Sequence, residues 1–328
     1  MGARDVNLTR DGRAPRLTGA AIRRLADPKK GGHILAQTPK FGLHAALVTP
    51  FDAAGDIDLP RMATHARSVI DGGCDGVTLF GTTGEGFGFS PAERRDAMAA
   101  VSAALPESAP IYAGVMSCGI ASAAGAASAA YEGGASGLLL APPFFLKGID
   151  PDGLFAWYAA VFDRIGAPLR NVILYHIPGQ TAVPIPVDLV TRLRASHPGA
   201  VTGIKDSSGD WDTTRAFLDA HGDLQILVGD ERQLPRAMAN GASGSICGVS
   251  NFLPGPLRDI IHAGAEGRAL TDLVDRIVAH PIIPAIKALT AHVSGDPGFL
   301  RVRPPLTALS DAARAALLAE YHTAMVPA

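Results

Sequence analysis

Short apolar runs that alternate with helix-forming stretches constrain the fold of this chain of 328 residues more than any other feature. From residue 43 onward, eight such runs end near Gly, Pro, Thr or Asp, and a helical stretch follows each one. This order is typical of a parallel sheet whose strands are connected by helices. The spacing of roughly 25 to 35 residues leaves room for a helix of about three turns between strands. The expected strands are residues 43–48, 76–80, 110–115, 137–141, 171–176, 201–205, 225–228 and 244–248.

The number of repeats favours a closed (β/α)8 barrel, a TIM barrel of the α/β class, over an open doubly wound sheet with the same periodicity. Polar residues follow the expected strands at their C-terminal ends, where such barrels carry their functional groups. The predicted organisation is a barrel core over residues 41–255. Residues 256–328 are expected to form the last barrel helix and a C-terminal helical extension. Two ordinary domains also fit the length of the chain.

Helix start signals support this reading of the chain. Ser90, followed by Pro91 and with Glu93 three positions on, predicts a capping box. Asp210 is expected to begin the helix after the sixth strand, and the final Ala-rich helix is expected over residues 311–325. Residues 1–40 carry nine Lys or Arg against three Asp and cannot bury much apolar surface alone. They are interpreted as an N-terminal extension, with one short helix near residues 20–25, that is either partly disordered or an arm on a neighbouring subunit.

Composition points to a small-molecule substrate. Lys plus Arg number 29 and Asp plus Glu number 31, so no overall field favours nucleic acid or an anionic membrane. The three cysteines match neither a zinc site nor a disulfide framework, which suits a reducing compartment, and they are expected to be small buried apolar residues. We find no secretory signal and no apolar stretch long enough to cross a membrane. The sequence therefore predicts a soluble, cytoplasmic protein.

Lys205 ends the expected sixth strand, and its apolar neighbours predict that its amine is buried. Burial favours the neutral amine, which can attack a ketone and form an iminium that withdraws electrons from the adjacent carbon. A lysine that pairs with Asp206 at a strand end explains the same position equally well. Tyr175 lies one repeat earlier, where its phenol can approach the amine and carry protons, although strand tyrosines also serve as packing residues.

The Gly-Thr-Thr-Gly-Glu turn after the second strand, residues 81–85, offers backbone amides and two hydroxyls to an anion such as a carboxylate. It lacks the spacing of a nucleotide-binding loop. Turns rich in Gly and Thr also occur for conformational reasons alone. The predicted catalytic residues are Lys205, Tyr175 and Thr82. The predicted substrate-binding residues are Thr83, Thr49, Gly84, Gln180, Ile246 and Phe145.

Four motifs in this order resemble the dihydrodipicolinate synthase/N-acetylneuraminate lyase family, from about Phe41 to the C-terminus. They are the turn at residues 81–85, Tyr175 in Tyr-His-Ile-Pro, Lys205 in Gly-Ile-Lys-Asp-Ser-Ser-Gly, and Arg303 in Arg-Pro-Pro-Leu-Thr-Ala-Leu-Ser. The resemblance implies a (β/α)8 barrel, commonly a homotetramer built as a dimer of dimers. It also implies that Lys205 is the Schiff-base lysine, Tyr175 the proton-transferring phenol, and Thr82 and Thr83 hydroxyl and carboxylate contacts.

Three positions depart from the lysine-biosynthesis member of that family. Phe145 stands where that enzyme donates a tyrosine to a proton relay across a subunit interface. Gln180 stands where its arginine holds the carboxylate of the aldehyde, and an amide offers no charge for such a clamp. His176 stands where asparagine is usual, and we interpret it as structural. Both Phe144 and Phe145 are also consistent with interface packing, or with a less polar second substrate.

These residues predict a class I lyase or aldolase that makes or breaks a carbon–carbon bond of pyruvate or another 2-oxo acid. Dehydration of a sugar-derived 2-oxo acid is a further reaction that fits such an enzyme. No metal and no separate cofactor are expected, because the ten histidines show no ligand grouping. The alternatives are the dihydrodipicolinate synthase of lysine biosynthesis and a barrel that binds a 2-oxo acid without turning it over. Asp206 is expected to cap a turn, whereas Asp230 and Glu231 either orient a substrate hydroxyl or begin a helix.

Overall fold

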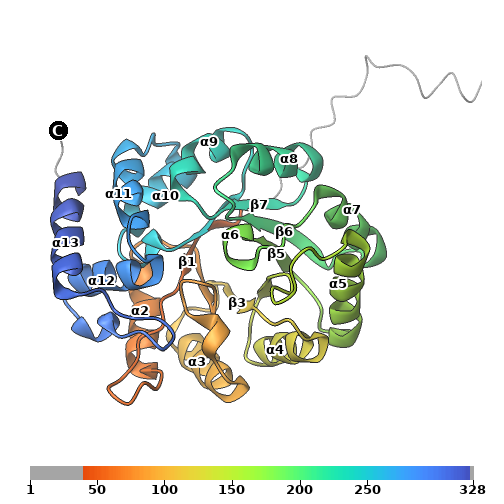
Figure 1. The fold of residues 1–328 in the computed structure, drawn as a ribbon, viewed down its shortest axis with the longest axis horizontal. Helices are drawn as coiled ribbons and strands as arrows, with labels where there is room; N and C mark the ends of the chain where they lie inside the picture. Colours follow the sequence, from red (N-terminus) through yellow and green to blue (C-terminus); the bar gives the residue numbers. More distant parts are fainter. Residues whose placement is uncertain (1–39, 326–328) are drawn as a thin grey trace, which may run out of the picture. The chain divides into compact units, whose positions relative to one another are not determined.

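The eight apolar runs form eight parallel strands, each hydrogen-bonded to the next, and β8 pairs with β1 to close the sheet. The computed structural model describes residues 40–325 (Figure 1). Every strand lies within two residues of the range expected from the sequence, and closure of the barrel is confirmed. The strands are β1 (Gly42–Ala46), β2 (Gly76–Leu79), β3 (Ile111–Val115), β4 (Gly137–Leu140), β5 (Val172–His176), β6 (Val201–Asp206), β7 (Gln225–Val228) and β8 (Gly244–Cys247).

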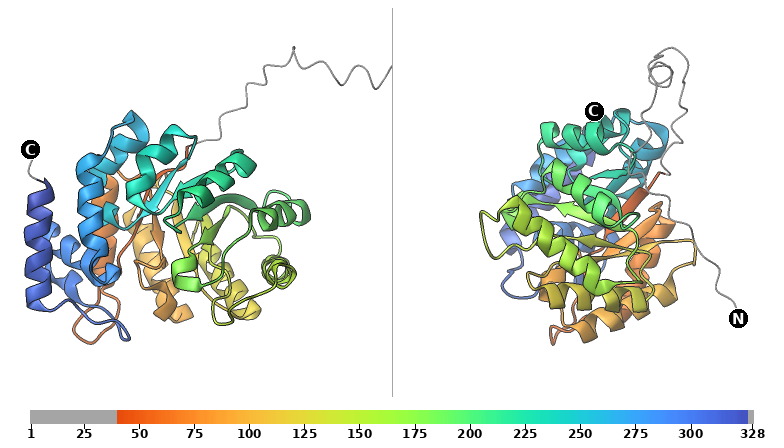
Figure 2. Two further views of the ribbon diagram at one scale, coloured as in Figure 1. Left: turned by 45° about the horizontal axis from the view of Figure 1, so that its top comes forward. Right: turned by 90° about the vertical axis from the view of Figure 1, so that its right-hand side faces the viewer.

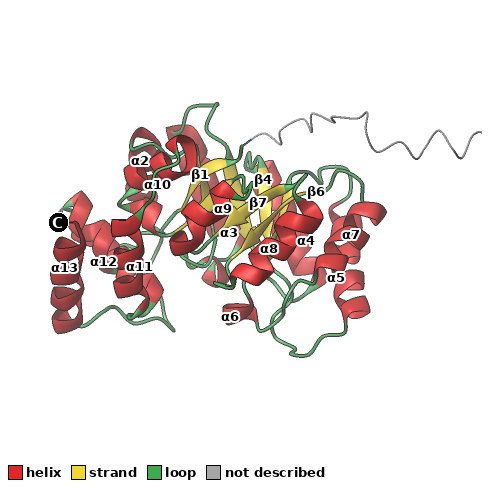
Figure 3. Cartoon of the chain, turned by 90° about the horizontal axis from the view of Figure 1, so that it is seen from above, coloured by secondary structure: helices red, strands yellow, loops and turns green. Residues whose placement is uncertain are grey.

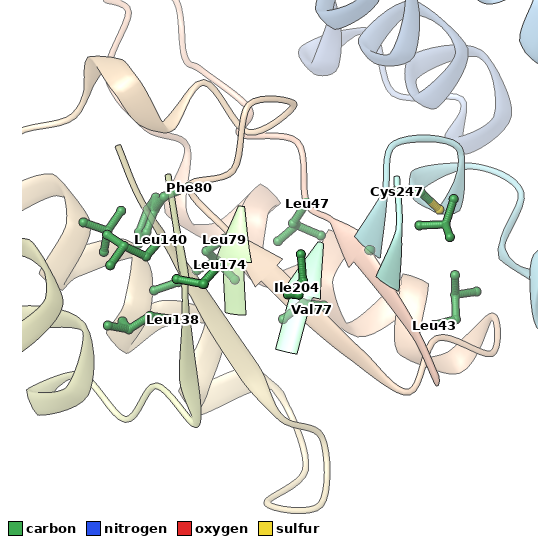
Figure 4. Packing of buried hydrophobic residues seen from close by; sticks show 14 of the residues in the cluster. Leu43, Leu47, Val77, Leu79, Phe80, Leu138, Leu140, Leu174, Ile204 and Cys247 are labelled. Atoms are coloured by element: carbon green, nitrogen blue, oxygen red, sulfur yellow. The ribbon is translucent and has the colours of Figure 1, made fainter. Parts of the chain in front are cut away.

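Alternation along the strands divides the core into two parts. In β5, Ile173 and Tyr175 belong to the cluster inside the barrel, whereas Val172 and Leu174 belong to the larger cluster between the strands and the helices. Figure 4 shows part of that larger cluster, to which the strands contribute Leu, Val and Ile side chains. His176 faces outward: its Nδ1 accepts a hydrogen bond from the Ile185 amide at 2.9 Å. The interior therefore receives Tyr175, while His176 has a structural role.

Helices connect successive strands and cover the outside of the barrel (Figure 2). The capping box at Ser90 is confirmed, because its hydroxyl accepts from the Glu93 amide at 3.3 Å and Glu93 accepts from the Ser90 amide at 2.8 Å. Asp210 caps the helix after β6, as expected. These helices are α2 (Leu59–Asp71), α3 (Pro91–Ala104), α4 (Ile120–Glu132), α5 (Pro151–Ile165), α6 (Pro178–Thr181), α7 (Val187–Ser196), α8 (Trp211–His221), α9 (Leu234–Ala239) and α10 (Pro254–Ala263).

Three further helices form the predicted C-terminal extension: α11 (Arg268–Val278), α12 (Ile282–Ser294) and α13 (Asp311–Met325). They gather at one side of the barrel (Figure 3). Helix α11 buries Leu270, Leu273, Val274 and Ile277, a spacing that gives a helix one apolar face. Helix α12 buries a continuous stretch from Ile283 to Ala291 that includes one charged residue, Lys287. Helices α11 and α12 are therefore firmly packed, whereas α13 buries only Leu317.

Predictions about residues 1–40, apart from the last residue, lie outside the described part of the chain. Between residues 40 and 325, no helix combines the length and apolar character needed to cross a bilayer. All three cysteines are free, and Cys74 and Cys247 are buried as expected. The expectation was wrong for Cys118, which is half-buried because it lies in the loop after β3, where its sulfur accepts from the Phe144 amide at 3.4 Å.

Candidate active site

An amine and a phenol meet inside the barrel at the C-terminal ends of β5 and β6. Tyr175 and Lys205 are direct partners in the register of the two strands. Lys205 Nζ donates to Tyr175 Oη at 3.4 Å and lies 4.4 Å from the centre of the phenol ring. Only 5 % of the Lys205 side chain is exposed, and Tyr175 is also buried. Parallel register thus brings together two residues 30 positions apart in the sequence.

The Lys205 amine is not held by an acid. Within residues 40–325, Lys205 forms no ion pair, and the neighbouring Asp206 is directed elsewhere. Asp206 accepts from the Ser208 amide at 2.9 Å and from the Thr214 hydroxyl at 2.6 Å. Its interpretation as a turn cap is therefore confirmed, and the structural alternative for Lys205, a pair with Asp206, is not observed. Among the described residues, the Tyr175 hydroxyl is the one hydrogen-bond partner of the amine, and Lys205 lines a cavity.

Thr82 extends this pair into a chain of three polar groups. Its hydroxyl lies 3.2 Å from Tyr175 Oη, so the phenol contacts both Thr82 and Lys205. A phenol that contacts both a hydroxyl and an amine can receive a proton from one and give it to the other. The geometry can therefore support proton transfer during formation of an imine.

The turn at residues 81–85 has an unusual backbone. Glu85 adopts a left-handed φ of 59°, as does Phe80 just before the turn, and this region is costly for residues other than glycine. Thr49 supports the turn from β1, since its hydroxyl donates to the Gly84 carbonyl at 2.7 Å. A Cβ on Gly84 would lie 2.5 Å from the Leu47 carbonyl. Thr49 thus holds the turn in place, and Gly84 lets the turn approach the Leu47 carbonyl.

A buried ion pair fixes the turn to the C-terminal extension. Lys287 Nζ lies 2.5 Å from Glu85 Oε1, and both side chains are almost fully buried. The same amine donates to the Thr49 carbonyl at 2.8 Å, and the second carboxylate oxygen of Glu85 accepts from the Arg303 amide at 2.9 Å. Burial lowers the pKa of the Lys287 amine, and the charge of Glu85 opposes that effect. Strain in the turn is therefore offset by contacts with residues more than 200 positions away.

Lys205, Tyr175 and Thr82 line a cavity of about 200 Å³. Six residues predicted from the sequence line it: Thr82, Thr83, Tyr175, Gln180, Lys205 and Ile246. Thr49 and Gly84 do not line it, and neither does Phe145, because the loop after β4 turns its side chain outward and leaves it 78 % exposed. Within this chain, Phe145 is therefore a surface residue and not part of the cavity.

A larger cavity of about 670 Å³ lies between α2, α10 and α12. Its polar groups are already engaged: the Arg61 guanidinium pairs with Asp58 and Asp296, and His65 Nε2 lies 3.0 Å from the Asn251 side-chain oxygen. Burial lowers the pKa of His65 to about 4. We therefore assign the candidate active site to the smaller cavity, which contains the unpaired amine.

The residues after β7 also reach the cavity. Asp230 begins a short 3-10 helix, since its carboxylate accepts from the Arg232 amide at 3.1 Å, which favours the helix-start interpretation for this residue. Glu231 is buried and accepts from the Val249 amide at 3.1 Å, and burial raises the pKa of its carboxyl group. In the part of the chain that the structure describes, no group of three or more His, Cys, Asp or Glu residues could hold a metal ion.

Gly229 and Ser207 are among the cavity residues that the sequence analysis missed. A Cβ on Gly229 would lie 2.0 Å from the Ser207 hydroxyl and 3.0 Å from Cε of Lys205, so only glycine leaves room for the lysine chain. Ser207 follows β6 and lines the cavity beside Lys205. The Gly-Asp dipeptide after the seventh strand indicates a turn, but it does not indicate that Gly229 lies against Lys205 and Ser207.

A closed (β/α)8 barrel with a buried lysine beside a tyrosine at the C-terminal ends of its strands defines the class: Schiff-base aldolases and lyases. The chain belongs to the dihydrodipicolinate synthetase family, whose sequence model matches residues 40–323. This confirms the resemblance drawn from the four motifs. Members of the family are lyases and aldolases, and a lysine Schiff base is typical of them.

Individual relatives agree with this membership. An uncharacterised DapA-like lyase from Chloroflexus aurantiacus is 36 % identical over 295 residues, which cover 87 % of this chain and 97 % of the relative. The crystal structure of a dihydrodipicolinate synthase from Agrobacterium tumefaciens is 43 % identical, with a TM-score of 0.84, covering 88 % of this chain and 100 % of the other. A dihydrodipicolinate synthase from Acinetobacter baumannii, solved in complex with pyruvate, is 25 % identical, with a TM-score of 0.76 and coverage of 88 % and 99 %.

Proposed function

We propose that this enzyme forms a Schiff base between Lys205 and pyruvate, or a close 2-oxo acid, and uses it to make or break a carbon–carbon bond with an aldehyde. The observation that carries the proposal is the Lys205 amine, which is 5 % exposed, has no carboxylate partner within residues 40–325, and lies 3.4 Å from the Tyr175 hydroxyl. An amine in this setting is a nucleophile with a proton carrier at its side.

The proposed reaction begins when Lys205 Nζ attacks C2 of pyruvate. The carbonyl oxygen receives two protons, one from the attacking amine and one through Tyr175, and leaves as water, which forms the iminium. Loss of a proton from C3 gives an enamine, and its C3 attacks the aldehyde carbon while the aldehyde oxygen takes up a proton. Water then adds to the iminium and releases Lys205 and a 4-hydroxy-2-oxo acid. The iminium itself stabilises the carbanion, so the sequence of steps needs no metal and no separate cofactor.

The carboxylate of the 2-oxo acid is assigned to the turn at residues 81–85. Thr83 lines the cavity on this turn, and Thr82 contacts Tyr175, so the turn faces the same space as the amine. Hydroxyls and backbone amides at a glycine-rich turn suit an anion. The pyruvate complex of the Acinetobacter baumannii relative supports a 2-oxo acid as the ligand.

The test is reductive trapping. Incubation with pyruvate and borohydride is expected to add one reduced pyruvyl group to the peptide that contains Lys205, detected by mass spectrometry. Lys287 is an internal control, because its buried amine is paired with Glu85 and should stay unmodified. An enzyme that gains no adduct at Lys205 would reject the mechanism.

The dihydrodipicolinate synthase reaction is the second candidate, favoured by the 43 % identity to the Agrobacterium tumefaciens structure. Gln180 lines the cavity but offers an uncharged amide to the carboxylate of an aldehyde, which argues against that substrate. A coupled assay with aspartate semialdehyde decides between them. A barrel that binds without turnover would instead give the Lys205 adduct and no deuterium exchange at C3.

We further propose that the chain assembles as a homotetramer, a dimer of dimers. Phe145 and Leu146 after β4 leave two large apolar side chains in solvent, and Phe87 and Ile120 are also exposed. Exposed apolar groups of this size are typical of subunit contacts. Light scattering should give four times the mass of 33.8 kDa for one chain, whereas a monomer would contradict this assembly.

A further inference from the structure

One wall of the active-site cavity comes from the C-terminal extension and not from the barrel. Helices α11 and α12 contribute five aliphatic side chains to the cavity that contains Lys205. None of the five carries a polar atom. They are Val274, Ile277, Val278, Ile282 and Ile286.

Two of these side chains are left in solvent. Val278 is 47 % exposed and Ile282 39 % exposed, and both belong to the few large apolar residues exposed in the described part of the chain. Apolar surface gains about 25 cal/mol for each Å² that a ligand removes from water. A substrate that lies against Val278 and Ile282 therefore binds more tightly if its adjoining group is apolar.

Charge at the site disfavours an anionic second substrate. The Lys205 amine is consumed when it forms the Schiff base. The other cationic side chain at the cavity, Arg232, already binds two carboxylates. Its guanidinium donates to Asp230 at 2.7 Å and to Asp275 at 2.8 Å. Glu231 adds a further acidic group to the lining. Among the described residues of the cavity, no cation is therefore left for a second carboxylate.

The cavity is also small. Its volume of about 200 Å³ lies below the range of roughly 300 to 1,000 Å³ common for ligand pockets. Pyruvate takes part of this space, which leaves room for a short alkyl chain or a single ring. The polar side of the cavity, with Ser207 and Gln180, remains available to the aldehyde oxygen and to the hydroxyl of the product.

We propose that the second substrate is an uncharged aldehyde whose short alkyl or aryl group packs against Val278 and Ile282. This inference rests on the proposed function, because it concerns the partner of the Lys205 enamine. It assigns substrate selection to α11 and α12, while the barrel strands supply the covalent chemistry. In the direction of cleavage, the same surface receives the apolar end of a 4-hydroxy-2-oxo acid.

The experiment compares condensation of pyruvate with butanal, benzaldehyde, glyceraldehyde and succinic semialdehyde. The full-length enzyme is expected to show a kcat/KM for butanal or benzaldehyde at least ~10-fold above that for succinic semialdehyde, in line with the discrimination of apolar pockets. Val278→Thr and Ile282→Asn are expected to lower kcat/KM for the apolar aldehydes by ~10-fold. Neither variant should change the rate of borohydride trapping with pyruvate.

Val293→Thr is the matched control. Val293 lies on α12 as Ile282 does and is 46 % exposed, but it does not line this cavity. Its substitution should leave every aldehyde unaffected. Two results would overturn the inference while leaving the proposed function intact, provided that pyruvate is still trapped at Lys205. One is equal kcat/KM for succinic semialdehyde and butanal. The other is unchanged kcat/KM for the apolar aldehydes in Val278→Thr and Ile282→Asn. Failure of trapping overturns the proposed function with it. A change in molecular mass in Val278→Thr without a change in preference assigns the surface to a subunit contact and also overturns the inference.

Discussion

Lys205→Ala is expected to remove all turnover, and Tyr175→Phe is expected to slow it by roughly 10²- to 10⁴-fold, the usual contribution of a positioned acid or base. Alanine leaves no amine to bond C2 of the 2-oxo acid. Phenylalanine keeps the ring beside Lys205 but removes the hydroxyl that lies 3.4 Å from Nζ and 3.2 Å from Thr82. Steady-state rates with the preferred aldehyde and the yield of the borohydride adduct measure the two effects.

The two variants should differ in binding. Tyr175→Phe is expected to retain affinity for pyruvate in calorimetric titration, because Thr83 and the turn are unchanged. Lys205→Arg is a useful control, since it keeps a long hydrogen-bond donor at this position but does not form an imine. Full activity in both Lys205→Ala and Tyr175→Phe would show that the assigned roles are wrong.

Lys287→Met is expected to lower the free energy of unfolding by roughly 3–5 kcal/mol, the effect of breaking a buried ion pair. The substitution leaves the Glu85 carboxylate buried without its counter-ion, and it removes the bond to the Thr49 carbonyl. Denaturant titration measures the loss. Because Glu85 belongs to the turn that is assigned to pyruvate, KM for pyruvate should rise in the same variant.

Arg67→Met is the control for this measurement. Arg67 and Asp71 form an ion pair on the surface of α2, with both side chains more than half exposed, and such pairs contribute about 0–1 kcal/mol. The double variant Glu85→Gln/Lys287→Met should lose less stability than the sum of its single variants, since it leaves no isolated charge. Equal losses in Lys287→Met and Arg67→Met would contradict the importance of the buried pair.

Local patterns in the sequence predicted what local physics determines. Apolar runs and turn residues gave the eight strands, Ser90 and Glu93 gave a helix start, and alternation gave the inward direction of Tyr175. The approach of Tyr175 to Lys205 could be predicted because parallel strands in register bring equivalent positions together. Phe145 was predicted from the family resemblance, at a position that is donated across a subunit interface, and a single chain leaves this side chain 78 % exposed.

Contacts between distant segments could not be predicted in this way. Lys287 stands out in the sequence as a charged residue within the mostly apolar helix α12, which indicates a buried ion pair. Its sequence neighbours do not indicate that Glu85 is the partner. The need for glycine at position 229 could not be predicted either, because it depends on the space that Lys205 and Ser207 occupy. The aliphatic wall was missed for a related reason: α11 and α12 have the apolar pattern of any packed helix, and only tertiary structure makes Val278 and Ile282 part of a cavity.

The dependence of the turn at residues 81–85 on Lys287 and Arg303 has a consequence for synthesis of the chain. A ribosome that has translated as far as α10 has delivered all eight strands, Lys205 and the turn itself, yet it has not made Lys287 and Arg303, which hold the turn through Glu85. Products that end before α12 are therefore expected to retain Lys205 but to lose the buried ion pair that orders the turn beside it.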